Sequence, residues 1–305
     1  MDGELGRRVA AVVVDFNSGD ALERCVASLR AAGVSTVVVV DNAAPERRVA
    51  PGTRDELDPP GELGSARLVR PSANLGYGAG VNLGAGELGS DVELLLVCNP
   101  DVVVLPEAVD LLVHVLDERA ELAVAGPMLR DSNGSIYPSG RSFPTLGESI
   151  GHGFFGMFWR TNPWTARYRL LGADQQRERD ADWVSGACML VRRVAFDAVG
   201  GFDQRYFMYV EDVDLCWRLR REGWSTRYVP GAQVVHEQGR STAARPYRML
   251  VAHHRSMMRF AERSTTGYRR SMLPLVAVGL IARLGLACLE HLVRARHRSP
   301  RGLVE

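Results

Sequence analysis

The first half of the chain alternates between short apolar runs and longer stretches in which apolar residues recur every three to four positions. Continuous β-branched and aliphatic runs are typical of strands buried on both faces of a parallel sheet, and helical spacing predicts amphipathic helices. The predicted strands cover residues 9–15, 35–40, 67–70, 93–98 and 122–126. The predicted helices cover residues 18–32, 77–88 and 107–119. Residues 45–65, rich in Pro, Gly and charge, predict a loop.

Polar residues follow two of these predicted strands directly. Asp41-Asn42 ends the second strand, and Asn99-Pro100-Asp101 ends the fourth. Alternation of strands and helices predicts an open, mostly parallel α/β sheet that binds its ligands at the carboxyl edge. Asp41 and Asp101 fall at that edge.

The second half resumes with one predicted apolar strand over residues 182–191. A helix ending at Gly223 and strands over residues 225–229 and 232–236 follow. Residues 140–168 mix glycines with Phe and Trp and match no regular sheet element.

Three carboxylates, Glu211, Asp212 and Asp214, come within four positions after the aromatic run Phe207-Met208-Tyr209. The pattern then becomes helical, so the acids lie where a helix begins and where its dipole favours negative charge. N-terminal capping and a metal cluster are the alternatives. Three acids after an aromatic run are better explained by a site that needs a base.

Two further motifs are consistent with a nucleotide site. Asp41 can accept hydrogen bonds from a nucleobase imide or a ribose hydroxyl, although a turn or cap Asp is common at strand ends. The glycines of residues 74–82 permit close backbone approach to a ligand, or tight helix packing. The segment contains no G-x-G-x-x-G pattern, and a Walker A motif is excluded because the chain has no lysine.

Asp101 can hold a hard divalent cation, which in turn holds a diphosphate. One carboxylate is too few for tight binding, and His236, at the end of another apolar strand, is a candidate second ligand. Imidazole suits Mn²⁺ better than Mg²⁺. The alternative is that His236 is structural, as a lone His more often is.

Composition narrows the class of protein only slightly. The 305 residues allow one large α/β domain with additions, or two small domains. A net charge of +1 gives no reason to expect nucleic acid as a partner. The five cysteines have neither metal-site nor redox-motif spacing, which favours a reducing cytosol. The short polar start, residues 1–8, does not match a signal peptide.

The C-terminal region contains a second unusual pattern. Residues 272–289 are apolar except for Arg283, and a basic tail follows over residues 294–301. The stretch is about long enough to span a bilayer, but Arg283 near its middle is costly there. An interfacial helix that attracts anionic lipid fits better. The alternative is a helix packed on the catalytic domain or in an oligomer.

Taken in order, these motifs resemble the family 2 inverting glycosyltransferases of GT-A fold. They are Asp41-Asn42, Asn74-x-Gly76, Asn99-Pro100-Asp101, Gly200-Gly201-Phe202-Asp203, Glu211-Asp212-x-Asp214 and His236. The resemblance covers roughly residues 9–240. Residues 131–139, 158–164 and 205–209 are similar to bacterial rhamnosyltransferases, in particular those of mycobacteria that build the linker between peptidoglycan and arabinogalactan.

The resemblance implies a GT-A catalytic domain over residues 1–245. Its nucleotide-sugar half would cover about 9–130 and its acceptor half about 131–245. Residues 246–305 would form a helical extension at the membrane surface. The reaction implied is transfer of L-rhamnose from dTDP-β-L-rhamnose to the GlcNAc of a polyprenyl-diphosphate-linked acceptor, at the cytoplasmic face of the membrane.

The resemblance also implies roles for single residues on the donor side. Asp41 would bind thymine or ribose. The rest of the donor pocket would be formed by Asn42, Asn74, Gly76, Asn99 and Asp101. Asp101 and His236 would coordinate Mg²⁺ or Mn²⁺ on the diphosphate. The chain departs from the family pattern at Asn99, where the usual Asp-x-Asp motif has its first carboxylate.

On the acceptor side, Asp212 would be the general base, with Glu211 and Asp214 positioning the acceptor or supporting Asp212. The residues implied beside the acceptor sugar are Trp183, Ser185, Gly186 and Ala187. Arg240 is either a ligand of a diphosphate or a solvated loop arginine. The aromatic residues 140–168 form an entrance for a lipid-linked sugar, a packed core or a dimer contact.

Three other functions are weighed against this one. The same fold can act on another donor or another surface-polysaccharide acceptor. A catalytically idle scaffold is disfavoured by intact Glu211, Asp212 and Asp101. A dinucleotide-dependent oxidoreductase is disfavoured because G-x-G-x-x-G is missing. Nucleic acid is not an expected partner, and homo-oligomer formation is compatible with the sequence.

Overall fold

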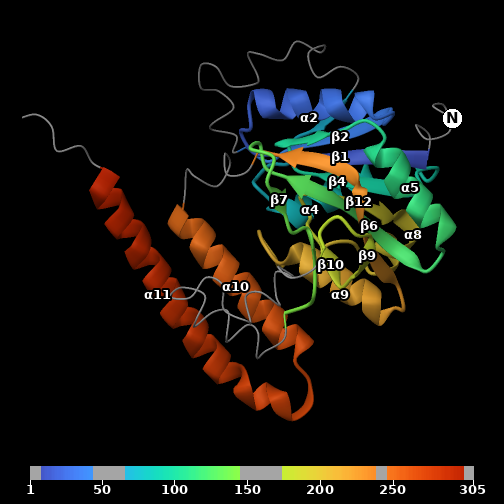
Figure 1. The fold of residues 1–305 in the computed structure, drawn as a ribbon. Helices are drawn as coiled ribbons and strands as arrows, with labels where there is room; N and C mark the ends of the chain where they lie inside the picture. The colour runs from blue at the N-terminus through green and yellow to red at the C-terminus, as the bar shows by residue number, and fades with distance from the viewer. Residues whose placement is uncertain (1–7, 44–65, 145–173, 238–245, 299–305) are drawn as a thin grey trace, which may run out of the picture.

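The computed structural model describes residues 8–43, 66–144, 174–237 and 246–298. Its centre is a ten-stranded sheet (Figure 1) in which eight strands follow the order β3-β2-β1-β4-β11-β6-β12-β5. These strands are β1 (Val9–Asp15), β2 (Thr36–Asp41), β3 (Arg67–Val69), β4 (Leu94–Cys98), β5 (Val102–Val104), β6 (Leu122–Arg130), β11 (Cys188–Arg192) and β12 (Ser225–His236).

The predicted mostly parallel sheet is confirmed in its first half. β3, β2, β1 and β4 run parallel, and Asp15 pairs with Asp41 at their carboxyl ends. β11 lies antiparallel between β4 and β6, while β6 and β12 are again parallel. Every residue of β1 is buried, as expected for a strand covered on both faces.

Helices cover both faces of the sheet. Alternate residues of β1, Val9, Ala11 and Val13, pack with the apolar faces of α2 (Asp20–Ala31) and α5 (Ala108–Glu118). Val12 and Val14 point to the opposite face, which is covered by α4 (Tyr77–Gly86), α8 (Arg193–Ala198) and α9 (Glu211–Arg221).

Three minor strand pairs complete the sheets. β7 (Ile136–Tyr137) pairs with β6, and β9 (Arg179–Ala181) pairs with β12. A separate two-stranded sheet joins β8 (Gly140–Arg141) to β10 (Trp183–Val184).

The predicted single strand over residues 182–191 is wrong, because it is broken into β10 and β11 around Ser185–Ala187. β10 leaves the main sheet to pair with β8, a partner far away in the sequence. In contrast, the two strands predicted over residues 225–236 form the single strand β12, with a register shift between Val229 and Gln233. β5, α8 and the length of β6 were not predicted.

The C-terminal helices α10 (Pro246–Ser264) and α11 (Leu273–Arg298) form a hairpin joined by the 3₁₀ helix η2 (Gly267–Met272). α10 packs against α9, where Phe260 meets Trp217 edge to face with centroids 6.2 Å apart. α11 runs along α10 on the side away from the sheet (Figure 1). The predicted apolar C-terminal helix is confirmed, and Gly267–Val293 is long and apolar enough to cross a membrane.

Candidate active site

The three acids of residues 211–214 lie in the first turn of α9, at the end of what we call the acid loop, residues 203–214. Val210 holds the N-cap position, so none of the acids is the N-cap residue. Tyr209 and Val210 both have left-handed backbones, with φ of 68° and 70°. Such a conformation is costly for a β-branched residue and persists only where surrounding contacts enforce it.

Asp212 is half-buried and is held by two backbone N–H groups. Its Oδ2 accepts a hydrogen bond from Gly186 N at 2.9 Å, and its Oδ1 accepts one from Val213 N at 2.9 Å. Burial raises the pKa of Asp212 and outweighs these hydrogen bonds. A partly exposed carboxylate of raised basicity is suited to accept a proton.

Glu211 is buried beside Asp212, with 6% of the residue exposed. Its Oε2 is buried and has no hydrogen-bond partner among the residues that the structure describes. Burial, and then the charge of Asp212, raise the pKa of Glu211 to about 8. At neutral pH Glu211 therefore keeps its proton, and the negative charge of the pair rests on Asp212.

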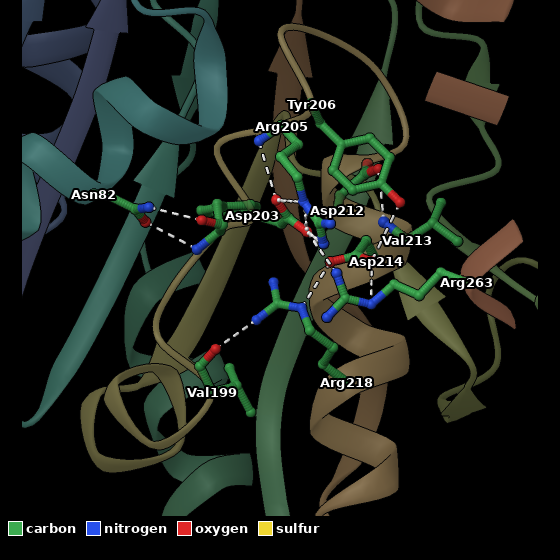
Figure 2. Close-up of polar contacts among 11 residues, drawn as sticks. Asn82, Val199, Asp203, Arg205, Tyr206, Asp212, Val213, Asp214, Arg218 and Arg263 are labelled. Atoms are coloured by element: carbon green, nitrogen blue, oxygen red, sulfur yellow. Dashed lines mark hydrogen bonds and ion pairs between the residues drawn. The ribbon is translucent and has the colours of Figure 1, made fainter. Parts of the chain in front are cut away.

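Asp214 lies only two residues further on but is completely buried. Its Oδ2 accepts from Arg218 Nε at 2.7 Å, and its Oδ1 lies 3.3 Å from the Tyr206 hydroxyl and 3.5 Å from Arg263 Nε (Figure 2). These contacts favour support of α9, rather than contact with an acceptor, as the role of Asp214.

The structure brings the predicted metal ligands together. Asp101 Oδ1 lies 3.1 Å from His236 Nε2. The side-chain nitrogen of Asn99, Nδ2, lies 3.4 Å from the same imidazole nitrogen. His236 Nδ1 is buried, and no atom of the described part of the chain forms a hydrogen bond with it. A separation near 3 Å matches two adjacent ligands, each about 2.1 Å from an octahedral cation. Within the described residues no third His, Cys, Asp or Glu joins them.

The predicted nucleotide-binding residues lie at the carboxyl end of β2 and in the loop before α4. Asp41 and Asn42 are both buried. Asn42 Nδ2 donates to Gly76 O at 2.8 Å, and Asn74 Oδ1 accepts from Gly76 N at 2.9 Å. Asp41 Oδ1 accepts from Ala43 N at 2.9 Å, and its Oδ2 lies 3.5 Å from Arg70 Nε. The two asparagines therefore fix the loop in place.

Gly76, in the loop before α4, is where that loop touches the acid loop. Its φ is +85°, and a Cβ there would lie 2.2 Å from Phe207 O. The next residue, Tyr77, donates its backbone N–H to that same carbonyl at 3.0 Å. Only glycine permits this approach, which gives the sequence motif a steric reason.

The turn Ser185–Ala187 connects Asp212 to Asn99, which lies beside Asp101. Gly186 N donates to Asp212, and Ala187 O accepts from Asn99 N at 2.8 Å. The Tyr77 hydroxyl donates to Gly186 O at 2.6 Å. Trp183 is buried just before the turn. The break in the predicted strand therefore supplies the backbone N–H that holds Asp212.

Sequence reasoning missed three residues of this region. Tyr77 positions the Gly186 turn, and Asp15 ends β1 directly beside Asp41. Arg141 is buried and stacks on Tyr137 and Trp183, and its charge partly offsets the rise that burial causes in the pKa of Asp212. The strand-end position was a usable signal for Asp15, whereas Tyr77 and Arg141 act through pairings distant in sequence. Arg240 and residues 145–168 lie outside the described residues.

Comparison with known proteins identifies the family of this chain. Residues 7–258 match the model of a family described as glycosyltransferase like family 2. A relative from Mycobacterium tuberculosis H37Rv, N-acetylglucosaminyl-diphospho-decaprenol L-rhamnosyltransferase, is 38% identical over 299 residues, covering 94% of this chain and 95% of that protein. The Escherichia coli K12 rhamnosyltransferase WbbL is 33% identical over 150 residues, covering 48% of this chain and 53% of that protein.

Among solved structures, the mannosyltransferase PcManGT of Pyrobaculum calidifontis, in complex with GDP-Man and Mn²⁺, superimposes with a TM-score of 0.56. It is 14% identical and covers 92% of this chain and 75% of that one. The likeness confirms the predicted GT-A type of fold.

Proposed function

This chain belongs to the glycosyltransferase family 2, and we propose that it moves L-rhamnose from dTDP-β-L-rhamnose to the GlcNAc of a polyprenyl-diphosphate-linked acceptor. The acceptor class follows the name of the Mycobacterium tuberculosis relative, which is similar along nearly the whole chain. One observation carries the proposal. The half-buried Asp212 carboxylate accepts a hydrogen bond from Gly186 N, and the neighbouring Ala187 O accepts one from Asn99 N, beside Asp101. One base and one diphosphate-binding edge are what an inverting transfer needs.

Asp212 is the proposed general base. The acceptor hydroxyl gives its proton to the Asp212 carboxylate while its oxygen forms a bond to C1 of rhamnose. The bond from C1 to the diphosphate oxygen breaks, and its electron pair leaves on dTDP. No covalent enzyme intermediate forms, so one carboxylate suffices, and protonated Glu211 leaves Asp212 as the charged member of the pair.

Asp101 and His236 are the proposed ligands of Mg²⁺ or Mn²⁺. Their 3.1 Å separation and the oxygen and nitrogen donor set fit such a cation. When bound, the cation would stabilise the negative charge that develops on the leaving diphosphate. Asp41, Asn42, Asn74 and Gly76 are proposed to line the nucleotide pocket. Ser185, Gly186 and Trp183 are proposed to lie beside the acceptor sugar.

The test is an incubation with dTDP-β-L-rhamnose, a GlcNAc-diphosphate-prenyl analogue and a divalent cation, with product identified by mass spectrometry. We expect one rhamnosyl group to be added. A panel of nucleotide sugars in a thermal-shift assay is run in parallel, because a donor that binds the native state raises its unfolding temperature. Stabilisation by another nucleotide sugar, without rhamnosyl transfer, would mean that the protein uses a different donor.

We further propose that α11 lies on the cytoplasmic face of the membrane. Its exposed large apolar residues fall on one half of the helix circumference at 100° per residue. They are Leu275, Val278, Ile281, Leu286, Leu289, Leu292 and Val293. Exposed Tyr268 and two arginines precede this face, and the basic residues 294–301 follow it. Aromatic and basic residues flanking an apolar face are typical of interfacial helices on anionic lipid.

Arg283 does not contradict this placement. After burial and the charge of His254, the Arg283 charge contributes to lowering the pKa of His253 on α10 to about 4. Arg283 therefore lies near α10, and the exposed apolar face is left without it.

Co-sedimentation with vesicles of phosphatidylglycerol and phosphatidylcholine tests the membrane proposal. The double variant Leu275→Glu/Ile281→Glu should lose most of its binding. Val194→Glu is the matched control, because Val194 is 64% exposed on α8, away from this face. Equal binding of the double variant and the wild type would refute contact through α11.

A further inference from the structure

One face of α10 is occupied by the acid loop. The Ser256 hydroxyl donates to Met208 O at 3.0 Å, and Arg259 donates to Arg205 O. His253, one turn earlier, meets the Tyr209 ring edge to face at 5.3 Å. Positions 253, 256 and 259/260 are three or four residues apart and therefore share one side of the helix.

Arg263 comes next on the same face and reaches both ends of the acid loop (Figure 2). Its Nη1 pairs with Asp203 Oδ2, and its Nε lies 3.5 Å from Asp214 Oδ1. Asp203 begins the loop, and Asp214 lies in the first turn of the helix that ends it. The family model matches residues 7–258, so Arg263 lies beyond it, in the C-terminal extension.

Between these two carboxylates lies the strained part of the loop. Tyr209 and Val210 have left-handed backbones, and Asp214 N donates to Val210 O at 2.9 Å. Asp212, two residues after Val210, accepts a hydrogen bond from Gly186 N across the site. The guanidinium of Arg263 contacts a carboxylate at each end of the loop. These two contacts oppose relaxation of the left-handed residues between them to a more common backbone conformation.

We infer that Arg263 is a positioning residue, which joins Asp203 to Asp214 and thereby holds Asp212 at the Gly186 amide. The inference rests on the proposed function, because it assigns Arg263 to the alignment of the proposed base. It makes the C-terminal hairpin part of the acceptor site as well as a membrane contact. Arg263 touches no reacting atom and acts through the loop.

Kinetics of Arg263→Gln and Arg263→Lys test this inference. Glutamine removes the charge, and lysine can pair with one carboxylate but lacks the fork of the guanidinium. A displaced base costs turnover, so we expect kcat to fall about tenfold to a hundredfold in Arg263→Gln, with the KM for the donor unchanged. Arg263→Lys should recover part of that loss.

Arg227→Gln is the matched control. Arg227 also bridges two carboxylates, Glu178 and Asp180, and its side chain is 22% exposed against 30% for Arg263. Its partners belong to β9 and the segment before it, away from the acid loop. A merely structural effect of losing a bridging arginine would appear equally in both variants, whereas a positioning effect should appear in Arg263→Gln alone.

Amide hydrogen exchange of residues 203–214 gives a readout that needs no substrate. We expect faster exchange in Arg263→Gln and wild-type exchange in Arg227→Gln. Normal exchange together with a wild-type kcat in Arg263→Gln would overturn the inference. If Arg263→Gln does not fold, Arg263→Lys decides, and a wild-type kcat in that variant overturns it. Wild-type protein that forms no product from any donor would refute the proposed function. Amide hydrogen exchange in Arg263→Gln would still show whether Arg263 holds the acid loop.

Discussion

Two regions meet at the site and are held by different structural means: the acid loop, and the ends of β2 and β4 with Asp41, Asn99 and Asp101, which we call the donor edge because we propose that it binds the donor. Asp41 is the last residue of β2, and Asn99 directly follows β4, with Asp101 two residues later. The buried strands of the sheet therefore fix where these residues lie. The acid loop has no regular structure before α9 and is held from outside by Gly76, the Gly186 turn and α10. The position of Asp212, the proposed base, therefore depends on these distant contacts, including those of the C-terminal extension.

Asp212 and Asp214 repeat this contrast within one helical turn. Asp212 accepts hydrogen bonds from backbone N–H groups and is partly open to solvent. Asp214 is fully buried and contacts Arg218, Arg263 and Tyr206. Removing the first should affect turnover, and removing the second should affect stability.

Asp212→Asn sharpens the comparison with the largest expected effect. Loss of a general base should lower kcat about 10²- to 10⁴-fold. The thermal shift produced by the donor should remain, because the donor edge is untouched. Steady-state kinetics and donor-dependent unfolding measure the two quantities. A variant that turns over at near the wild-type rate would remove Asp212 as the base.

Asp214→Asn should show the opposite profile in unfolding experiments. Removing one partner of a buried ion pair leaves Arg218 uncompensated, so we expect a loss of about 3–5 kcal/mol in the free energy of unfolding. Asp197→Asn is the control, because Arg193–Asp197 is also an i,i+4 pair, but the Asp197 side chain is 55% exposed. That exposed pair should contribute less than about 1 kcal/mol. Equal losses in urea titrations would contradict the buried role.

The same contrast explains what the sequence could predict. The strand over residues 9–15 and the residues after β2 and β4 were found because buried β-branched runs have a local signature. The break at Gly186 was missed because it depends on pairing of β10 with β8. Arg263 was also missed, since its two partners lie 49 and 60 residues away by number (263 − 214 and 263 − 203). No local pattern encodes such contacts.

His236→Ala tests the donor edge with an intermediate effect. If Asp101 and His236 share a cation, losing the imidazole should raise the half-saturating concentration of Mn²⁺ by at least about tenfold. Titration of metal-depleted protein with Mn²⁺, followed by activity and by thermal shift with dTDP, measures the change. His114→Ala is the control, because His114 is exposed on α5 and pairs with Glu118. An unchanged metal dependence in His236→Ala would leave His236 a structural residue.

Glu211→Gln should have the smallest effect on turnover of these variants, and its test concerns the pH dependence of stability. Glu211 has a pKa raised from 4.5 to about 8, so between these values the folded state holds a proton that the unfolded state has released. Stability from this group therefore falls as pH rises through that window, by at most about 1.4 kcal/mol per pH unit. Glutamine mimics the protonated acid and should flatten the slope between pH 5 and 8, measured by urea unfolding, while preserving most of kcat at neutral pH. Glu118→Gln, at an exposed site on α5, removes the same charge and should keep the wild-type slope. A Glu211→Gln variant that keeps that slope would mean that Glu211 is ionised in the folded protein, and the negative charge would then not rest on Asp212 alone.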